Sequence, residues 1–424
     1  MGSYNGFCDP NRSWFKPLRL SHLSSFSRSI RSPTADFALE KTGSSETIDC
    51  LLRCSRSEYG SLACLNHSFR SLIQGGELYR LRCQLGIVEH WVYFYCKNAN
   101  KWDAYDPKEK RWMTTPPMPN DECFKCAGKK REIAQNMPFE CLKCGKKKSL
   151  AVGTELLVFS DDFEEQIVLR YSILSNSWTN GVWMNKCRFH FASASLGETA
   201  IVAGGFDKFG NVLNSAELYN SVTRCWVRIP SMNKGRCMFS GVFMNGKFYV
   251  VGGRSRDHHT LTCGEEYDLE KQSWRVIPNM AAGLNSLESS SPFVAVVRNE
   301  LYGADYLEWV LKKYDKKSNV RVTLGPMPSM QEWVLPVNVA FCACGDRLLA
   351  INNFLGYYRV PFEIYSWVPD NDGPPQWNII TKRSGIAVNS CDRFFDPSLD
   401  PYDYLFADFS LRKPVPVSPN SGKY

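Results

Sequence analysis

Hydrophobic residues follow a helical spacing in the first part of the chain. Between residues 46 and 85 they recur mainly every three or four positions, which places them on one face of a helix. Gly75-Gly76 interrupts this pattern, and Glu77–Leu85 is long enough for a further short helix. We predict a helical segment over residues 46–90, whose hydrophobic face consists of Ile48, Leu51, Leu52, Tyr59, Leu62, Leu65, Phe69, Leu72 and Ile73.

From Trp91 onward the pattern changes to short hydrophobic runs that repeat along the chain. A tyrosine followed seven residues later by a tryptophan occurs three times at intervals of 48 residues, and a double glycine recurs at the same interval. Agreement between several residue types at one interval indicates a structural repeat. These residues are Tyr171 and Trp178, Tyr219 and Trp226, Tyr267 and Trp274, Gly204 and Gly205, and Gly252 and Gly253.

Each repeat contains the elements of one small β-sheet. Continuous hydrophobic runs such as residues 200–203 are typical of strands buried between stacked sheets. The glycines permit a close backbone approach, and the aromatic residues supply area for packing. One sheet alone leaves two faces exposed, whereas a ring of sheets buries both. We therefore predict an all-β propeller of about six blades over residues 91–380. Its units start near Trp91, Leu150, Phe191, Phe239, Phe293 and Val339.

The last part of the chain departs from the repeat. The fifth unit has Gly303-Ala304 in place of the double glycine, and Arg321 stands where a tryptophan is expected. Residues 384–396 offer a poor closing strand, so we interpret residues 381–424 as an irregular tail. The ring is then expected to close imperfectly, because an unclosed ring leaves two exposed strand edges.

The net charge of +8 is concentrated in three short segments. Residues 1–45, 121–148 and 411–424 carry +3, +4 and +3, which leaves −2 on the rest of the chain. We therefore expect no nucleic-acid partner.

No hydrophobic run has the length of a membrane span, and the N-terminus lacks the hydrophobic core of a secretory signal, so we expect no membrane partner either. Residues 1–45 are interpreted as a disordered tail rich in Ser and Arg, with a transit peptide as the alternative.

Most of the 17 cysteines stand singly in hydrophobic runs, which favours a reduced protein of the nucleus or cytoplasm. Four of them form two Cys-x2-Cys pairs at a spacing that suits a tetrahedral zinc site. The sequence around the first pair is duplicated around the second, which favours an inserted surface loop over 121–148 with no cofactor. Zinc remains the alternative, with Cys123, Cys126, Cys141 and Cys144 as its ligands.

Four further residues are possible contacts to a target. Arg188 and Arg236 recur at the repeat interval, which favours structural hydrogen bonds between blades over target binding. His258 and His259 lie together in the loop after a double glycine. Adjacent histidines point apart, so they do not supply the spaced ligands of a copper oxidase, which is the enzyme alternative.

Loops that differ between repeats are better candidates for recognition, because the loops of a rigid scaffold carry binding residues. Residues 206–213 and 254–261 are the two loops of this kind that follow the double glycines.

The repeats resemble kelch repeats, and the segment before them resembles an F-box. The pieces Thr47-Ile-Asp-Cys-Leu51, Arg56-Ser-Glu-Tyr59 and Glu89-His-Trp91 are similar to the F-box/kelch-repeat proteins of plants. Within the repeats, Arg188-Phe-His-Phe-Ala-Ser-Ala-Ser195 and Val202-Ala-Gly-Gly205 are similar to the same family. The resemblance covers residues 46–380.

This resemblance implies a non-catalytic substrate receptor of a cullin-based, SCF-type ubiquitin ligase. The hydrophobic face of the F-box would bind a Skp-type adaptor on the cullin scaffold, and the propeller would hold a target protein that the sequence does not identify. One departure concerns the adaptor contact. An F-box usually opens with a Leu-Pro stretch, whereas residues 40–47 contain neither Leu nor Pro. A kelch interaction module with a degenerate F-box is therefore an alternative.

Overall fold

The structure is a computed structural model that describes residues 45–96, 101–119, 148–159, 167–284, 291–305, 307–328, 339–352, 362–369, 373–383 and 407–410. The chain divides into two compact units, Met1–Arg53 and Cys54–Tyr424. The described part of the first unit is helix α2 (Ser45–Arg53), in which Ile48, Leu51 and Leu52 are buried. The predicted tail before residue 45 lies outside the described residues.

The second unit begins with four short helical elements: the 3₁₀ helix η1 (Arg56–Glu58), α3 (Tyr59–Leu65), α4 (His67–Gln74) and α5 (Glu77–Leu85). Ser55 and Glu58 form a reciprocal capping box at η1, and Gly76 and Gly86, both with positive φ, bound α5. The helical prediction is confirmed and α5 has the expected bounds.

The hydrophobic face predicted across residues 59–73 does not belong to a single helix. Asn66 has an extended backbone, and its side chain accepts a hydrogen bond from the N–H of Phe69 over 2.8 Å. The residue therefore ends α3 and caps the start of α4.

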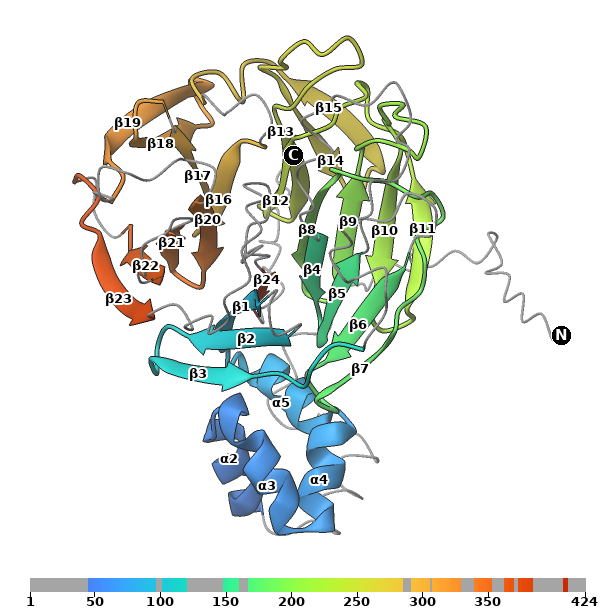
Figure 1. Ribbon diagram of the computed structural model, residues 1–424, viewed down its shortest axis with the longest axis vertical. Coiled ribbons are helices and arrows are strands. Elements are labelled where there is room, and N and C mark those ends of the chain that lie inside the picture. The colour runs from blue at the N-terminus through green and yellow to red at the C-terminus, as the bar shows by residue number, and fades with distance from the viewer. Residues whose placement is uncertain are drawn as a thin grey trace, which may run out of the picture. The chain divides into compact units, whose positions relative to one another are not determined.

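The rest of the second unit is a six-bladed β-propeller in which each blade is a four-stranded antiparallel sheet (Figure 1). The first blade contains β1 (His90–Cys96), β2 (Lys101–Asp106) and β3 (Arg111–Thr114). The second contains β4 (Lys148–Val152), β5 (Glu155–Phe159), β6 (Val168–Ser172) and β7 (Ser177–Asn180). The third contains β8 (Ala192–Leu196), β9 (Thr199–Ala203), β10 (Ala216–Asn220) and β11 (Cys225–Ile229).

The fourth blade contains β12 (Ser240–Met244), β13 (Lys247–Val251), β14 (Gly264–Asp268) and β15 (Ser273–Ile277). The fifth contains β16 (Phe293–Val297), β17 (Glu300–Asp305), β18 (Val310–Asp315) and β19 (Val320–Pro326). The sixth contains β20 (Val339–Cys344), β21 (Arg347–Asn352), β22 (Phe362–Trp367) and β23 (Asn378–Arg383). The predicted number of blades is confirmed, and the predicted starts fall within a few residues of the first strand of each blade in the sequence.

The ring closes within the first blade, and the interpretation of residues 381–424 as an irregular tail is wrong at this point. Strand β24 (Ala407–Ser410) pairs antiparallel with β1, with His90 opposite Ser410 and Tyr93 opposite Ala407. It occupies the innermost position of its sheet, and the six innermost strands contact one another in a closed circle. The strand follows a long stretch without the repeat pattern, so the sequence did not reveal it.

The seven-residue spacing of tyrosine and tryptophan in the repeats corresponds to a packed pair of aromatic rings. Tyr219 lies directly opposite Trp226 in the third blade, with ring centroids 4.8 Å apart. Three other blades hold the same pair at 4.8 to 5.2 Å: Tyr105 and Trp112, Tyr171 and Trp178, and Tyr267 and Trp274.

The tryptophans also connect neighbouring blades. The indole N–H of Trp226 donates to the carbonyl of Val182, in the segment that precedes the third blade. Trp178 and Trp274 donate in the same way to Pro116 and Pro230. Each aromatic pair therefore packs its own sheet and fixes the sheet to the segment before it.

Candidate functional site

The double glycines follow the second strand of their blades, at a point where no side chain fits. Gly205 has φ +88°, and a Cβ atom there would lie 2.2 Å from the carbonyl oxygen of Phe189. Gly253 has φ +93°, and a Cβ there would lie 2.6 Å from the carbonyl oxygen of Cys237. The glycines thus bring the start of each loop against the segment that leads into the blade.

Arg188 and Arg236 are buried side chains that stabilise the backbone at the double glycines. The Arg188 guanidinium donates to the carbonyls of Gly204 and Ser215 and, over 2.7 Å, to the carboxylate of Glu217. Arg236 makes the equivalent bonds to Gly252, Cys263 and Glu265.

Both arginine side chains are fully buried, so the suggestion that they contact a target is wrong. They make structural hydrogen bonds, as the favoured interpretation expected, but within a blade and not between blades.

Glu217 and Glu265, the acidic partners of these arginines, were not identified from the sequence. The carboxylate of Glu217 also accepts hydrogen bonds from the backbone N–H groups of Asn185 and Lys186. The carboxylate of Glu265 accepts the equivalent hydrogen bonds from Asn233 and Lys234. Glu217 and Glu265 recur at the 48-residue interval, a signal that could have identified them. Each buried pair therefore anchors the segment entering the blade to the third strand of the sheet.

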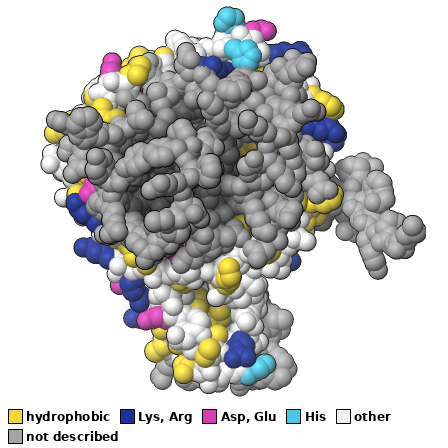
Figure 2. Space-filling view, in the orientation of Figure 1, with side chains coloured by type: hydrophobic (Ala, Val, Ile, Leu, Met, Phe, Trp, Pro, Cys, Tyr) yellow, Lys and Arg dark blue, Asp and Glu magenta, His cyan; other side chains and the backbone are white. Residues whose placement is uncertain are grey.

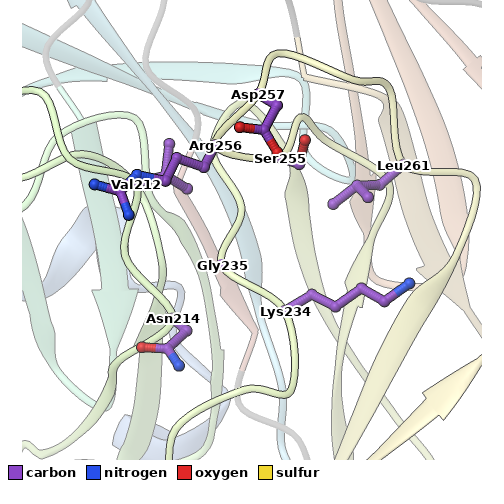
Figure 3. A pocket seen from close by; sticks show the side chains of 8 residues that line it. All are labelled: Val212, Asn214, Lys234, Gly235, Ser255, Arg256, Asp257 and Leu261. Atoms are coloured by element: carbon purple, nitrogen blue, oxygen red, sulfur yellow. The ribbon is translucent and has the colours of Figure 1, made fainter.

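The two predicted recognition loops border one pocket. The pocket has a volume of about 360 Å³ and lies between the β9–β10 loop of the third blade and the β13–β14 loop of the fourth (Figure 3). Val212 and Asn214 line it from the third blade, Lys234 from the segment between the blades, and Ser255 and Arg256 from the fourth blade. The pocket combines exposed cationic groups with hydroxyl and amide groups, which suits recognition of a polar segment of another protein.

His258 and His259 are exposed and belong to the same β13–β14 loop. Figure 2 shows histidine side chains at the upper edge of the view, beside basic and acidic side chains, in agreement with the exposure of this loop. Among the described residues, no group of three or more His, Cys, Asp or Glu could hold a metal ion. Cys123, Cys126, Cys141 and Cys144 lie outside the described residues, so zinc binding there stays a hypothesis.

The predicted adaptor-binding residues differ in exposure. Leu65 is 69% exposed at the end of α3, and Tyr59, Leu62 and Phe69 are partly exposed. The other five, Ile48, Leu51, Leu52, Leu72 and Ile73, are buried. Within this part of the chain, the surface available to a partner is therefore centred on Leu62, Leu65 and Phe69.

The helices are joined to the propeller through Glu89. Its carboxylate accepts hydrogen bonds from Arg56 and Arg82 and from the indole of Trp91, at 2.8 to 3.3 Å. Burial alone would raise the pKa of Glu89, but the two arginines hold the pKa below its usual value. This cluster connects the helical segment to the first strand of the first blade.

A second connection joins α5 to the third blade. The hydroxyl of Tyr79 donates to the carboxylate of Glu198 over 2.7 Å, and Ser221 also hydrogen-bonds this carboxylate. Glu198 lies in the β8–β9 turn. Because consecutive strands are antiparallel, this turn and the β9–β10 loop lie at opposite ends of the sheet. The helices therefore contact the end of the blade that lies away from the pocket.

No helix in the described ranges is long and hydrophobic enough to span a membrane.

Comparisons with known proteins agree with both parts of the chain. The model of the Kelch motif matches residues 187–233 and 235–281, which contain all the strands of the third and fourth blades. The F-box/kelch-repeat protein SKIP11 of Arabidopsis thaliana is 46% identical over 83% of this chain and 74% of its own length. The F-box/kelch-repeat proteins At1g26930 and At1g74510 of the same plant are 42% and 44% identical, over 82% and 81% of this chain and 82% and 76% of their own lengths. With these relatives, the six blades and the helices before them, the chain belongs to the F-box/kelch-repeat proteins.

Proposed function

We propose that this protein is the substrate-recognition subunit of an SCF-type ubiquitin ligase. The helical segment binds a Skp-type adaptor, which connects it to the cullin scaffold, and the propeller binds the target. The protein itself performs no covalent step, because proximity between the target and the partner enzyme is sufficient. We also propose that it works in the nucleus, the cytoplasm or both, which imaging of a fluorescent fusion would test.

The observation that carries this proposal is the arrangement within the second unit. Helix α3 presents an exposed leucine, Leu65, while α5 is fixed to the third blade through Tyr79 and Glu198. The candidate recognition pocket lies at the other end of that blade. An adaptor bound to α3 and α4 and a target bound at the pocket would thus occupy separate surfaces.

Co-purification with a Skp-type adaptor tests the adaptor contact. The full-length chain should retain the adaptor, and Leu65→Asp should lose most of it, because a carboxylate would be buried without a partner in the interface. Leu85→Asp is the matched control, since Leu85 is 59% exposed on α5 and is not part of the predicted face. If the full-length chain, Leu65→Asp and Leu85→Asp retained equal amounts of adaptor, the surface around Leu65 would be ruled out as the adaptor-binding site.

A further variant addresses the missing Leu-Pro lead. If the natural chain fails to bind the adaptor and a variant carrying Leu-Pro in residues 40–47 binds it, the protein has a degenerate F-box. If neither binds, the adaptor-binding role is wrong.

A further inference from the structure

The loops that follow the double glycines in the third and fourth blades have the same backbone hydrogen bonds. In the third blade, the N–H of Asp207 donates to Asn211 and that of Gly210 donates back to Asp207, both over 3.0 Å. In the fourth blade, 48 residues later, Ser255 donates to His259 over 2.9 Å and His258 donates back to Ser255 over 3.1 Å. The third blade therefore serves as an internal reference for the fourth.

The two loops differ in what their first side chain does. The carboxylate of Asp207 accepts the backbone N–H groups of Phe209 and Asn211, both over 2.9 Å, and the side-chain amide of Asn211. This carboxylate is the anion around which the loop is built.

Ser255 takes the place of Asp207 in the fourth blade, so this loop has no carboxylate at its first position. The hydroxyl oxygen of Ser255 is buried and has no hydrogen-bond partner. Within the described part of the chain, the N–H groups of Asp257 and His259, which correspond to those of Phe209 and Asn211, have no hydrogen-bond acceptor either. The fourth blade thus retains the backbone of an anion-binding turn without the carboxylate that Asp207 supplies in the third.

The surroundings of this turn favour a negative charge. Arg256 and Lys234 border the pocket and are exposed, and neither forms an ion pair among the described residues (Figure 3). Asp257 is the single acidic residue in the pocket lining. Arg256 corresponds to Lys208 of the third blade, where the turn already contains its own carboxylate.

We propose that the β13–β14 loop binds an acidic side chain of the target protein. The anion takes the position that the Asp207 carboxylate holds in the third blade, where it accepts hydrogen bonds from the N–H groups of Asp257 and His259. Arg256 and Lys234 neutralise its charge. The inference rests on the proposed function, in that it identifies how the propeller recognises its target. The anion is a carboxylate or a phosphate group, since both accept hydrogen bonds in this geometry.

Fluorescence anisotropy with the full-length protein and short labelled peptides tests the proposal. The probes are a decapeptide of alternating Gly and Glu, the same peptide with Gln, and the Gln peptide with one phosphoserine. The Glu peptide, the phosphoserine peptide or both should bind at least about tenfold more tightly than the Gln peptide, because hydrogen bonds to charged groups are the stronger kind. A preference between the first and the third probe identifies the anion.

Ser255→Asp is the decisive variant, because it supplies the loop with its own carboxylate, as in the third blade. It should weaken binding of the acidic probe at least about tenfold while the protein remains folded. Ser255→Asn should also weaken binding, since its amide oxygen accepts the same N–H groups without adding a charge. Arg256→Gln should weaken binding, whereas Lys208→Gln, the same charge change in the third blade, should not.

Equal binding of the Glu and Gln probes with no preference for phosphoserine, or full binding by Ser255→Asp, would overturn the proposal. Adaptor co-purification with the same proteins separates this result from the proposed function. Loss of adaptor binding with intact probe binding contradicts the ligase role alone, and the reverse result contradicts the anion site alone.

Discussion

The guanidinium of Arg321 lies 5.5 Å from the ring centroid of Tyr314, directly opposite it across β18 and β19, where four other blades place a tryptophan. Its Nη2 donates to the carbonyl of Met280 over 2.8 Å, much as three of those tryptophans donate to the segment before their blade. Its Nε and Nη1 are buried without a partner, and burial lowers the pKa of Arg321 to about 10. The residue preserves the geometry of the repeat while leaving part of a charge unpaired.

Replacing Arg321 should therefore cost little. We expect Arg321→Met to change the free energy of unfolding by less than about 1 kcal/mol, because removing a poorly paired buried charge offsets the loss of its contacts. Urea denaturation followed by tryptophan fluorescence measures this value. A loss of several kcal/mol would show that the guanidinium contributes more than its single hydrogen bond indicates.

The same substitution at Arg236 should have a large effect. Arg236→Met leaves the buried carboxylate of Glu265 and two carbonyls without their donor, so we expect a loss of about 3–5 kcal/mol in the free energy of unfolding. Arg228→Met, at an exposed position on β11, is the control and should change stability by no more than about 0.5 kcal/mol. If Arg236→Met resembled this control, the buried pair would not support the blade.

Truncation tests the closing strand. A chain ending at Arg383 lacks β24, which exposes an edge of β1 and opens the ring, so we expect a lower melting temperature and aggregation. A chain ending at Ser410 retains β24 and should have the same melting temperature as the full-length protein. Differential scanning fluorimetry and size-exclusion chromatography distinguish the two, and identical behaviour would mean that β24 is dispensable.

The Glu89 cluster predicts a pH dependence of stability. The pKa of Glu89 is lower in the folded protein than its usual value, so the unfolded chain binds a proton first as the pH falls. The stabilisation is complete above the unfolded pKa of about 4.3 and is lost as the pH falls through the folded value. In Glu89→Gln the melting temperature should be lower at pH 7 and should depend less on pH between 7 and 3. An unchanged pH profile would contradict this role.

The contact between Tyr79 and Glu198 predicts a local effect in the helices. Tyr79→Phe removes a hydrogen bond to a charged acceptor, and amide exchange in α5 should become about tenfold faster. Arg80→Ala is the control, since the Arg80 side chain is 61% exposed and its ion pair with Glu77 lies at the surface, where such pairs contribute little. Hydrogen exchange measured by mass spectrometry would report the difference, and equal rates in both variants would show that the contact does not hold the helix.

The aromatic residues made the propeller predictable from sequence. Tyr219 and Trp226 are seven residues apart because that spacing places them opposite each other across a hairpin, and the spacing survives in most blades. The helical segment was predictable from its hydrophobic spacing. The break at Asn66 was not, because a polar residue between two short helices is compatible with one longer helix until its cap is seen.

The two loops that border the pocket were selected from the sequence, but the chemistry of the pocket required the structure. Ser255 is an unremarkable residue in the sequence, and its meaning depends on the hydrogen bonds that Asp207 makes 48 residues earlier. The repeat interval indicated a structural role for Arg188, but its pairing with Glu217, 29 residues away in the chain, was seen only in the structure. Strand β24 could not be found at all, since four residues without the repeat pattern carry no periodic signal.

The closure of the ring by β24 has a consequence for the order of protein synthesis. A ribosome produces the helices and the first three strands of the first blade long before it produces residues 407–410. A nascent chain can therefore fold its helical segment while the ring of blades is still open. The ring closes only once residues 407–410 have been made and have paired with β1, so a closed ring reports that all six blades have been synthesised.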